Sequence, residues 1–368
     1  MTPDIYIGVM SGTSLDGIDV AAIRINDQFS FLAADCIKIP ENLRQQILML
    51  TQPGNNEIEQ MGRLDIALGK LFASAVNQLI NCQNIDTKNI AAIGCHGQTI
   101  RHRPEAGFTL QIGDPNTVAE QTGLTTIADF RRRDLANGGQ GAPLVPAFHN
   151  NVFRSTESDR VILNIGGMAN ITVLPANTSL AVTGYDTGPG NILSDAWIYE
   201  HSGASFDEDG NWARAGAVNT ELLQHLLNLP FFTEAAPKST GREQFHIGWI
   251  KQIIRENKLQ IVAADVQATL LELTARSIAD AINTQRLADP ELYICGGGVH
   301  NSTLIERLRE LTNATHITTT EALGLHPDWV EASAFAWLAH QTLNQLTGNL
   351  PSVTGSTAEK ILGGIYQA

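Results

Sequence analysis

The sequence predicts an α/β fold built from two domains. Its 368 residues are more than one hydrophobic core usually holds, and at roughly 150 residues per domain the length favours two. Apolar runs of strand length alternate with stretches of helical periodicity, which is the order typical of α/β proteins. The layout of residues 5–25, an apolar run, a small-residue turn and a second apolar run, returns near residue 161.

Composition excludes several classes of function. Hydrophobic residues make up 43% of the chain, so a large core forms and global disorder is excluded. The 38 acidic residues outnumber the 24 basic ones, which disfavours binding to nucleic acid or to an anionic membrane. The N-terminus has no signal-peptide pattern, and every apolar run is shorter than the roughly 18 residues of a membrane span. We expect a cytoplasmic protein.

The elements of the first half follow from local patterns. The apolar runs 5–9 and 18–25 flank the turn MSGTSLDG and predict a β-hairpin. Apolar residues at helical spacing predict a helix over 57–80. Further along, the patterns predict strands at 90–94, 108–112 and 125–129 and a helix at 115–122.

The second half repeats this order. The run 161–165, Gly166-Gly167 and the segment ITVL predict a second hairpin. Asp265 is expected to cap a helix, and the strand 292–295 runs into three glycines. The remaining expectations are a helix capped by Asn301 or Ser302 and a crossing between the halves at Pro143 and Pro146.

Three glycine-rich turns follow apolar runs, at 12–17, at 166–167 and at 296–298. Glycine admits positive φ and lets backbone N–H groups approach a phosphate closely. The hydroxyls of Thr13 and Ser14 would add donors, and a nearby aspartate would hold Mg²⁺. Each cluster taken alone is also explained by a tight turn. The P-loop and Rossmann glycine motifs are missing, which disfavours both of those nucleotide sites.

Two hairpins and a separate glycine turn before a helix resemble the actin, Hsp70 and sugar-kinase superfamily. Longer motifs make the chain similar to one family, the anhydro-N-acetylmuramic acid kinases of bacterial peptidoglycan recycling. The motifs run in order from residue 8 to the C-terminal region. They are GVMSGTSLDGID, CHGQTIRH, LQIGDPNTVA, ADFRRRDLANGGQGAPLVP, NIGGMANIT, GYDTGPGN, ICGGGVHN, WVEASAFAWLA and TGSTAEKILGGIY.

This resemblance implies a two-lobed, actin-like (ribonuclease H-like) fold with the ligand cleft between the lobes. Lobe I would comprise 1–140 with the tail 346–368, and lobe II would comprise 141–345. The implied activity uses ATP and Mg²⁺ to open 1,6-anhydro-N-acetylmuramic acid with water and to form N-acetylmuramic acid 6-phosphate. Where the superfamily usually carries an aspartate in its first strand, this chain reads Ile-Gly-Val-Met, so Asp16 or Asp19 would supply the metal ligand.

Asp186 in GYDTGPGN is the candidate catalytic residue. Glycines at 184, 188 and 190 leave little bulk around its carboxylate, which suits a general base. An Asx-turn in a loop is the structural alternative. In the family that the chain resembles, the aspartate of this motif is the catalytic base.

The segment DFRRRD carries the candidate substrate residues Asp129 and Arg131. Such a run is also explained as a solvated face held by its own ion pairs. The resemblance places the run at the sugar, where an arginine would pair with a lactyl carboxylate. The sequence does not decide which of the three arginines does so.

The other candidates for substrate binding are His96, Gln98 and Glu331. His96 and Gln98 follow an apolar run, where a structural role is the alternative for the histidine. Glu331 lies on an apolar helix, so it has a partner or faces the ligand. The residues expected at ATP are Gly12, Thr13, Ser14, Leu15, Asp16, Gly17, Ile18, Asp19, Gly166, Gly167, Asn170, Gly296, Gly297 and Gly298.

Two other functions stay open at this point. One is a kinase for a free sugar hydroxyl, and the other is an actin-like or Hsp70-like ATPase that switches a protein partner. Phosphate found on a sugar or released as inorganic phosphate separates them. The expected partners are a small sugar and ATP, and whether the protein is a homodimer is left open.

Overall fold

The computed structural model describes residues 3–12, 15 and 17–368. The chain divides into two compact units. The first comprises Met1–Phe153 with Trp329–Ala368, and the second comprises Arg154–Asp328. Each unit is described by itself below.

These units differ from the predicted division by two helices, α5 (Val145–Val152) and α12 (Val330–Leu343). Both belong to the first unit, because α12 packs on β1, β2 and β4 and also contacts α5. The indole Nε1 of Trp337 donates a hydrogen bond to Oδ1 of Asn151 at 3.2 Å across that helix pair. Pro143 therefore precedes a helix of the first unit and Pro146 lies in its first turn, so neither marks the crossing between the units.

One sheet forms the centre of the first unit. Its described strands lie in the order β12-β6-β4-β1-β2-β3, with β5 paired to β4. Strands β2 and β3 are antiparallel to their neighbours, whereas β1, β4 and β6 are parallel. The strands are β1 (Ile5–Ser11), β2 (Ile18–Ile25), β3 (Phe29–Ile37), β4 (Ile90–Arg103), β5 (Phe108–Ile112), β6 (Thr126–Ala128) and β12 (Gly364–Tyr366).

The sheet of the second unit repeats this arrangement. Its order is β11-β10-β7-β8-β9, where β7, β10 and β11 are parallel and β8 is antiparallel to both of its neighbours. The strands are β7 (Arg160–Ile165), β8 (Met168–Leu174), β9 (Thr183–Pro189), β10 (Glu291–Cys295) and β11 (His316–Thr319). Both units therefore have one topology, and the chain has the α/β, actin-like fold class that the sequence predicts.

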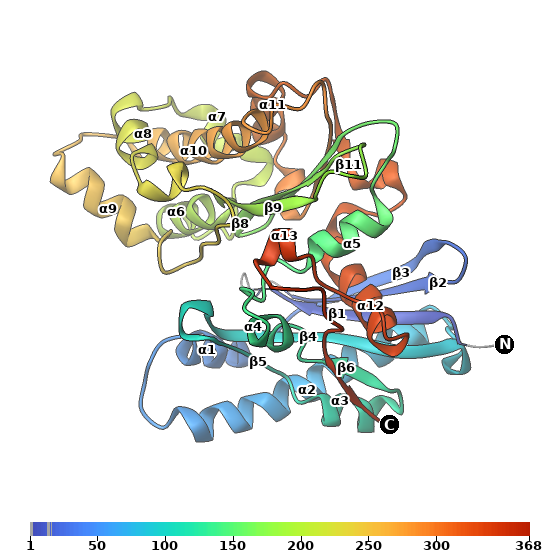
Figure 1. Cartoon of the computed structure of the whole chain (residues 1–368). Helices are drawn as coiled ribbons and strands as arrows, with labels where there is room; N and C mark the ends of the chain where they lie inside the picture. The colour runs from blue at the N-terminus through green and yellow to red at the C-terminus, as the bar shows by residue number, and fades with distance from the viewer. Residues whose placement is uncertain (1–2, 13–14, 16) are drawn as a thin grey trace. The chain divides into compact units, whose positions relative to one another are not determined.

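Helices cover both faces of the first sheet (Figure 1). Side chains alternate along β1, so Ile7 and Val9 join the core formed with α2, while Tyr6 makes an edge-to-face contact with His340 of α12, with ring centroids 5.1 Å apart. The helices of this unit are α1 (Glu41–Leu50), α2 (Glu57–Cys82), α3 (Pro115–Thr122), α4 (Arg132–Ala136), α5, α12 and α13 (Pro351–Thr354).

In the second unit, α10 packs on β8 and β9 and touches α6, α7, α8 and α11 (Figure 1). One core joins the sheet to α10 and α11, and a second core lies among α6, α8, α9 and α10. The helices are α6 (Ile192–Ser202), α7 (Asn211–Ala215), α8 (Thr220–Leu227), α9 (Ile247–Glu256), α10 (Ala263–Asn283) and α11 (Ser302–Leu311).

Both predicted hairpins are confirmed, and so is the cap of α11, because Oδ1 of Asn301 accepts a hydrogen bond from the N–H of Leu304. The prediction for Asp265 is wrong. Helix α10 begins two residues earlier with Val262 as its N-cap, and Oδ1 of Asp265 accepts from the N–H of Ala217 instead. A local pattern cannot show that a distant backbone group competes for a capping side chain.

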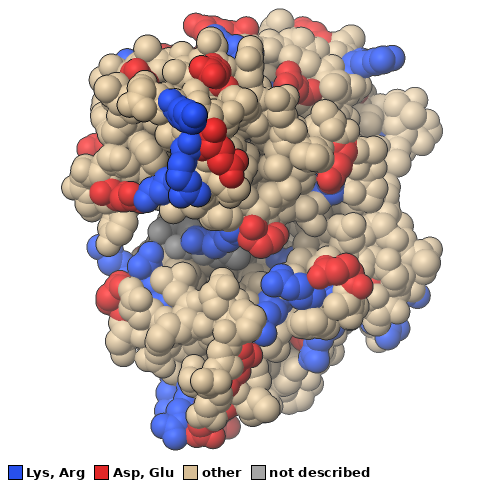
Figure 2. Space-filling model, turned by 90° about the vertical axis from the view of Figure 1, so that its left-hand side faces the viewer, with Lys and Arg blue, Asp and Glu red and all other residues tan. Residues whose placement is uncertain are grey.

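Across the described part of the chain, no helix is both long enough and apolar enough to cross a membrane. Figure 2 shows one face of the molecule, on which basic and acidic side chains lie interspersed among uncharged ones.

Candidate functional site

Three predicted substrate residues gather where the parallel strands β1 and β6 end beside the longer strand β4. Ser11 at the end of β1 pairs in register with Gln98 of β4, and its Oγ donates to Oε1 of Gln98 at 2.6 Å in the interior. His96 lies on the same strand and is 5% exposed. Both predicted residues therefore lie within β4, which continues past the expected strand end at 94.

Arg131 follows β6 and points at His96. Its Nε and Nη2 donate to Nε2 of His96 at 3.1 and 2.9 Å, and its Nη1 donates to the carbonyl of Gly141 at 2.8 Å. Toward the described residues, three of the five N–H groups of the guanidinium are used, which leaves two for a ligand. Burial lowers the pKa of Arg131 to about 10, so the side chain stays charged at neutral pH.

The neighbouring arginine has a different role. Arg132 donates from Nε to Oδ1 of Asp129 at 2.7 Å and forms an exposed ion pair with the same carboxylate. Asp129 itself has φ +62°, a left-handed conformation that non-glycine residues adopt rarely. The structure thus distinguishes two arginines of the run that the sequence could not tell apart. Arg132 binds Asp129 within the turn, and Arg131 binds His96.

Glu331 lies in the first turn of α12. Burial raises its pKa, Asp19 of β2 raises it further, and Arg131 opposes both effects. Asp19 and Glu331 are two carboxylates close enough to interact in a desolvated place. Such a pair favours a cation beside it.

Only part of the first glycine turn is described. Thr13, Ser14 and Asp16 lie outside the described residues. Leu15 and Ile18 are 3% and 0% exposed and belong to the core, so only their backbone can meet a ligand. A side chain at Gly17 would overlap the Sγ of Cys36, which makes glycine necessary there for close packing.

The second and third glycine turns meet at the carboxyl ends of β7 and β10. Cys295 pairs in register with Asn164, so the turns that follow both strands leave the sheet at the same edge. A side chain at Gly296 would overlap Oδ1 of Asn164, and the N–H of Gly190 donates to the carbonyl of Gly167 at 2.9 Å. The backbone is therefore closely packed at this edge.

Two glycines in these turns are different. A Cβ added at Gly167 or at Gly297 would meet no described protein atom within 4 Å. The fold does not need glycine at either position for packing, and neither φ is positive. Close approach of a ligand remains as a reason for glycine there.

Asp186 lies on β9 at a β-bulge. Its register partner is the predicted ATP residue Asn170 on β8, while Gly188 pairs with Ala169, so Thr187 is the extra residue of the bulge. The hydroxyl of Thr187 donates to the carbonyl of Ala169 at 3.2 Å. Bulges beside a site turn a side chain out of the regular alternation. Asp186 therefore lies in a β-strand and not in the Asx-turn of a loop, which was the structural alternative for this residue.

A segment that the sequence did not single out holds this carboxylate. Oδ2 of Asp186 accepts from the N–H of Thr240 at 2.9 Å, and the N–H of Asp186 donates to the carbonyl of Lys238 at 3.2 Å. Nζ of Lys238 in turn donates to the carbonyl of Phe231 at 2.8 Å. No local signal in residues 231–244 points to Asp186, because the contact spans 54 residues.

Burial raises the pKa of Asp186 to about 7. The hydrogen bond from Thr240 lowers this pKa, Glu243 raises it, and Lys238 lowers it. A carboxylate with a pKa near neutrality is well matched to general base catalysis, since it is both ionised in part and basic.

The described residues contain no group of three or more His, Cys, Asp or Glu side chains placed to hold an ion. Magnesium in phosphoryl-transfer enzymes usually takes only one or two carboxylates, together with waters and substrate phosphates. Asp19, whose charge raises the pKa of Glu331, is a carboxylate of the kind that this smaller donor set requires.

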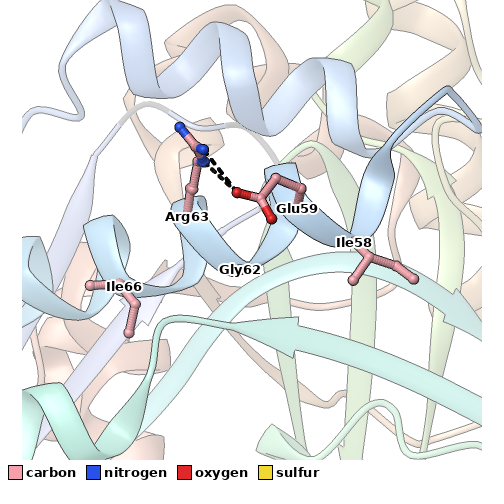
Figure 3. A pocket seen from close by; sticks show the side chains of 5 residues that line it. All are labelled: Ile58, Glu59, Gly62, Arg63 and Ile66. Atoms are coloured by element: carbon pink, nitrogen blue, oxygen red, sulfur yellow. Dashed lines mark hydrogen bonds and ion pairs between the residues drawn. The ribbon is translucent and has the colours of Figure 1, made fainter.

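One hollow on the surface, of about 440 Å³, contains none of the predicted residues. Figure 3 shows that it lies along α2, where Ile58 and Ile66 flank Gly62 beside the ion pair of Glu59 and Arg63. Apart from that ion pair, the hollow has no charged or nucleophilic group. None of the predicted catalytic, nucleotide or substrate residues lines this hollow.

Comparison with known proteins agrees with the motifs. The family described as anhydro-N-acetylmuramic acid kinase matches residues 4–368. The chain belongs to this family. It is therefore a kinase, an ATP-using phosphotransferase. Among proteins of this name, that of Shewanella pealeana is 52% identical over 372 residues and that of Saccharophagus degradans is 51% identical over 372 residues, with 100% of each chain covered.

A family member from Coxiella burnetii is 48% identical, and the match covers 100% of this chain and 98% of that one. Solved structures show a weaker likeness. Component A of the (R)-2-hydroxyglutaryl-CoA dehydratase of Acidaminococcus fermentans is 10% identical with a TM-score of 0.45, over 90% of this chain and 99% of that one. That score is too low to add to the argument.

Proposed function

We propose that this anhydro-N-acetylmuramic acid kinase opens the 1,6-anhydro bridge of its sugar with water and phosphorylates O6 from ATP in the same event. The products are N-acetylmuramic acid 6-phosphate and ADP. The observation that carries the proposal is the carboxylate of Asp186, held on a bulge with a pKa near 7 among small residues.

Asp186 is the general base in this mechanism. It removes a proton from a water molecule as the water oxygen forms a bond to C1 of the sugar. The bond between C1 and O6 breaks, and O6 attacks the γ-phosphorus of ATP while ADP leaves. The electron pair released from C1 thus ends in the new O6–P bond, and no free alkoxide has to persist.

Arg131 binds the lactyl carboxylate of the sugar through its two remaining N–H groups. Its contact with the neutral ring of His96 supports this role, because burial and the charge of Arg131 hold the pKa of His96 well below its usual range. A neutral imidazole orients the guanidinium without neutralising it, so the positive charge stays available for a carboxylate.

The backbone of the glycine turns at 166–167 and 296–298 holds the nucleotide in this proposal. Open space at Gly167 and Gly297 supports this assignment. Magnesium would be held by Asp19, with Asp16 as a further ligand, and it would neutralise charge on the phosphates. Glu331 would bind a hydroxyl of the sugar.

The test is mass spectrometry of the products formed from anhydro-sugar, ATP and Mg²⁺ in H₂¹⁸O. We expect a sugar that has gained one phosphoryl group and one ¹⁸O atom at C1. Gain of phosphate without ¹⁸O would indicate a kinase for a free hydroxyl. Release of inorganic phosphate with an unchanged sugar would indicate an ATPase, and either result refutes the proposal.

A further inference from the structure

The fully buried carboxylate of Asp134, in α4, has no part in the mechanism above. Its Oδ2 accepts a hydrogen bond from the N–H of Gly141 at 2.8 Å. Its Oδ1 accepts from Nδ2 of Asn349 at 2.6 Å and from Oγ1 of Thr354 at 2.8 Å. Hydrogen-bond donors of this kind offset the free-energy cost of burying a carboxylate away from water. Two of the three come from the C-terminal segment, more than 200 residues away.

Gly141 connects this carboxylate to Arg131. Its N–H binds Asp134, and its carbonyl accepts from Nη1 of Arg131 at 2.8 Å. The loop has to lie close to both groups, because a side chain at Gly139 would overlap Oδ2 of Asp134 and Gly141 has φ +70°. A continuous series of hydrogen bonds therefore runs from Thr354 through Asp134 and Gly141 to the guanidinium.

The C-terminal segment is held to the Arg131 segment in other places as well. The N–H of Gln140 donates to the carbonyl of Thr354 at 2.8 Å, and the N–H of Thr357 donates to the carbonyl of Asn137 at 3.0 Å. Strand β12 pairs with β6, the strand that leads to Arg131. Residues 349–366 thus contact the segment 126–141 on the strand and on the loop.

We propose that Asp134 and Thr354 are positioning residues that orient Arg131 for the carboxylate of the substrate. This inference rests on the proposed function in one respect, that Arg131 binds a carboxylate. Two N–H groups can grip both oxygens of a carboxylate only when the guanidinium plane is oriented correctly. His96 holds one edge of that plane and Gly141 holds Nη1, so rotation of the plane requires Gly141 to move.

The experiment compares two substrates, the anhydro-sugar and the same sugar with its carboxyl group converted to a primary amide. The variant Thr354→Val removes one hydrogen bond to Asp134 at nearly constant volume. We expect its KM for the carboxylate substrate to rise about tenfold, with KM for ATP and for the amide substrate unchanged. Thr354→Ser, which keeps the hydroxyl, should restore the wild-type KM.

A second measurement needs no substrate. The ¹⁵N resonance of His96 Nε2 reports the hydrogen bond from Arg131, and we expect it to shift in Thr354→Val. Thr357→Val is the matched control, because among the described residues the Thr357 hydroxyl donates to Asn137 and not to Asp134. That control should leave both the resonance and KM unchanged.

The outcomes distinguish failure of the proposed function from failure of the positioning role of Asp134 and Thr354. A wild-type protein that does not phosphorylate the anhydro-sugar refutes the proposed function, and the His96 resonance still decides the positioning role. An unshifted resonance in a folded Thr354→Val protein overturns the inference, as does an equal rise in KM for both substrates. If Thr354→Val does not fold, Asp134→Asn is measured in the same way with the same expectation.

Discussion

Gly8 and Gly94 are register partners on the parallel strands β1 and β4, and helix α12 lies directly on both of them. A side chain at Gly8 would overlap the carbonyl oxygen of Ala332, and one at Gly94 would overlap that of Phe335. Gly8 and Gly94 therefore form a strip of the sheet without side chains, and the backbone of α12 packs directly on this strip. Glu331 is the residue just before this contact, so the strip sets its height above the sheet.

We expect Gly94→Ala to lower the free energy of unfolding by about 3 kcal/mol, because the methyl group has to displace the backbone of α12. Urea unfolding measures the change. Gly62→Ala is the control: it lies within α2 with open space at its Cβ, so alanine should stabilise the protein by about 0.5–1 kcal/mol. Equal stability of both variants would contradict the tight contact.

Asp186→Asn should bind ATP and anhydro-sugar as the wild type does, because the amide keeps the shape of the carboxylate. Its kcat should fall by roughly 10²- to 10⁴-fold, the contribution typical of a positioned general base. Isothermal titration and product assays check the two halves of this expectation. Asp280→Asn on the exposed face of α10 serves as the control. Near-normal turnover in Asp186→Asn would remove Asp186 from its role.

The pH dependence of kcat/KM should report the same carboxylate. The base must be ionised, so kcat/KM should fall about tenfold per unit of pH below about 7 and level off above it. Glu243→Gln removes a negative charge that raises the pKa of Asp186, and the midpoint should therefore move to lower pH. Glu221→Gln on α8 should leave the midpoint in place, and a profile flat from pH 5 to 8 would disprove the assignment.

The two neighbouring arginines should behave differently. Arg131→Lys cannot present two parallel N–H groups, so KM for the sugar should rise about 10- to 100-fold while KM for ATP stays constant. Arg132→Lys changes an exposed ion pair with Asp129 and should leave both constants near those of the wild type. Steady-state kinetics with each substrate varied in turn measures the KM for sugar and the KM for ATP of both variants. The reverse pattern would place Arg132 at the substrate.

Substitution should also distinguish a glycine that the fold needs from a glycine that the nucleotide needs, by its effect on melting temperature or on KM for ATP. Gly297→Ala should melt at the wild-type temperature and raise KM for ATP about tenfold, since its methyl group meets ligand and not protein. Gly296→Ala combines φ +80° with overlap onto Asn164, so its melting temperature should fall. Wild-type KM for ATP in Gly297→Ala would argue against nucleotide near that turn.

Local patterns predicted the elements that depend on neighbours in the sequence, namely both hairpins, the long helix at 57–82 and the strands that precede the glycine turns. They also singled out Asp186 and the run of three arginines at 131–133, because glycines around a carboxylate and clustered arginines are conspicuous patterns in the sequence. The family resemblance supplied the activity. The local patterns did not predict which residue forms a hydrogen bond with each of these side chains.

Those partners lie far away in the sequence. Thr240 holds Asp186 across 54 residues, and Thr354 holds Asp134 across 220. A backbone N–H or a threonine hydroxyl has no distinguishing pattern of its own. A lone glycine in a strand does signal a close approach of another backbone, but it does not say which one. The pairing of Gly8 with α12 therefore appears only in the folded chain.

The first unit is assembled from both ends of the chain, whereas the second unit is one uninterrupted stretch, Arg154–Asp328. During synthesis from the N-terminus, the second unit can complete its sheet while the first still lacks α12 and β12. The strip at Gly8 and Gly94 stays uncovered until α12 has been synthesised. A nascent chain can therefore complete β9, with Asp186, before the segment 349–366 reaches the loop that contacts Arg131.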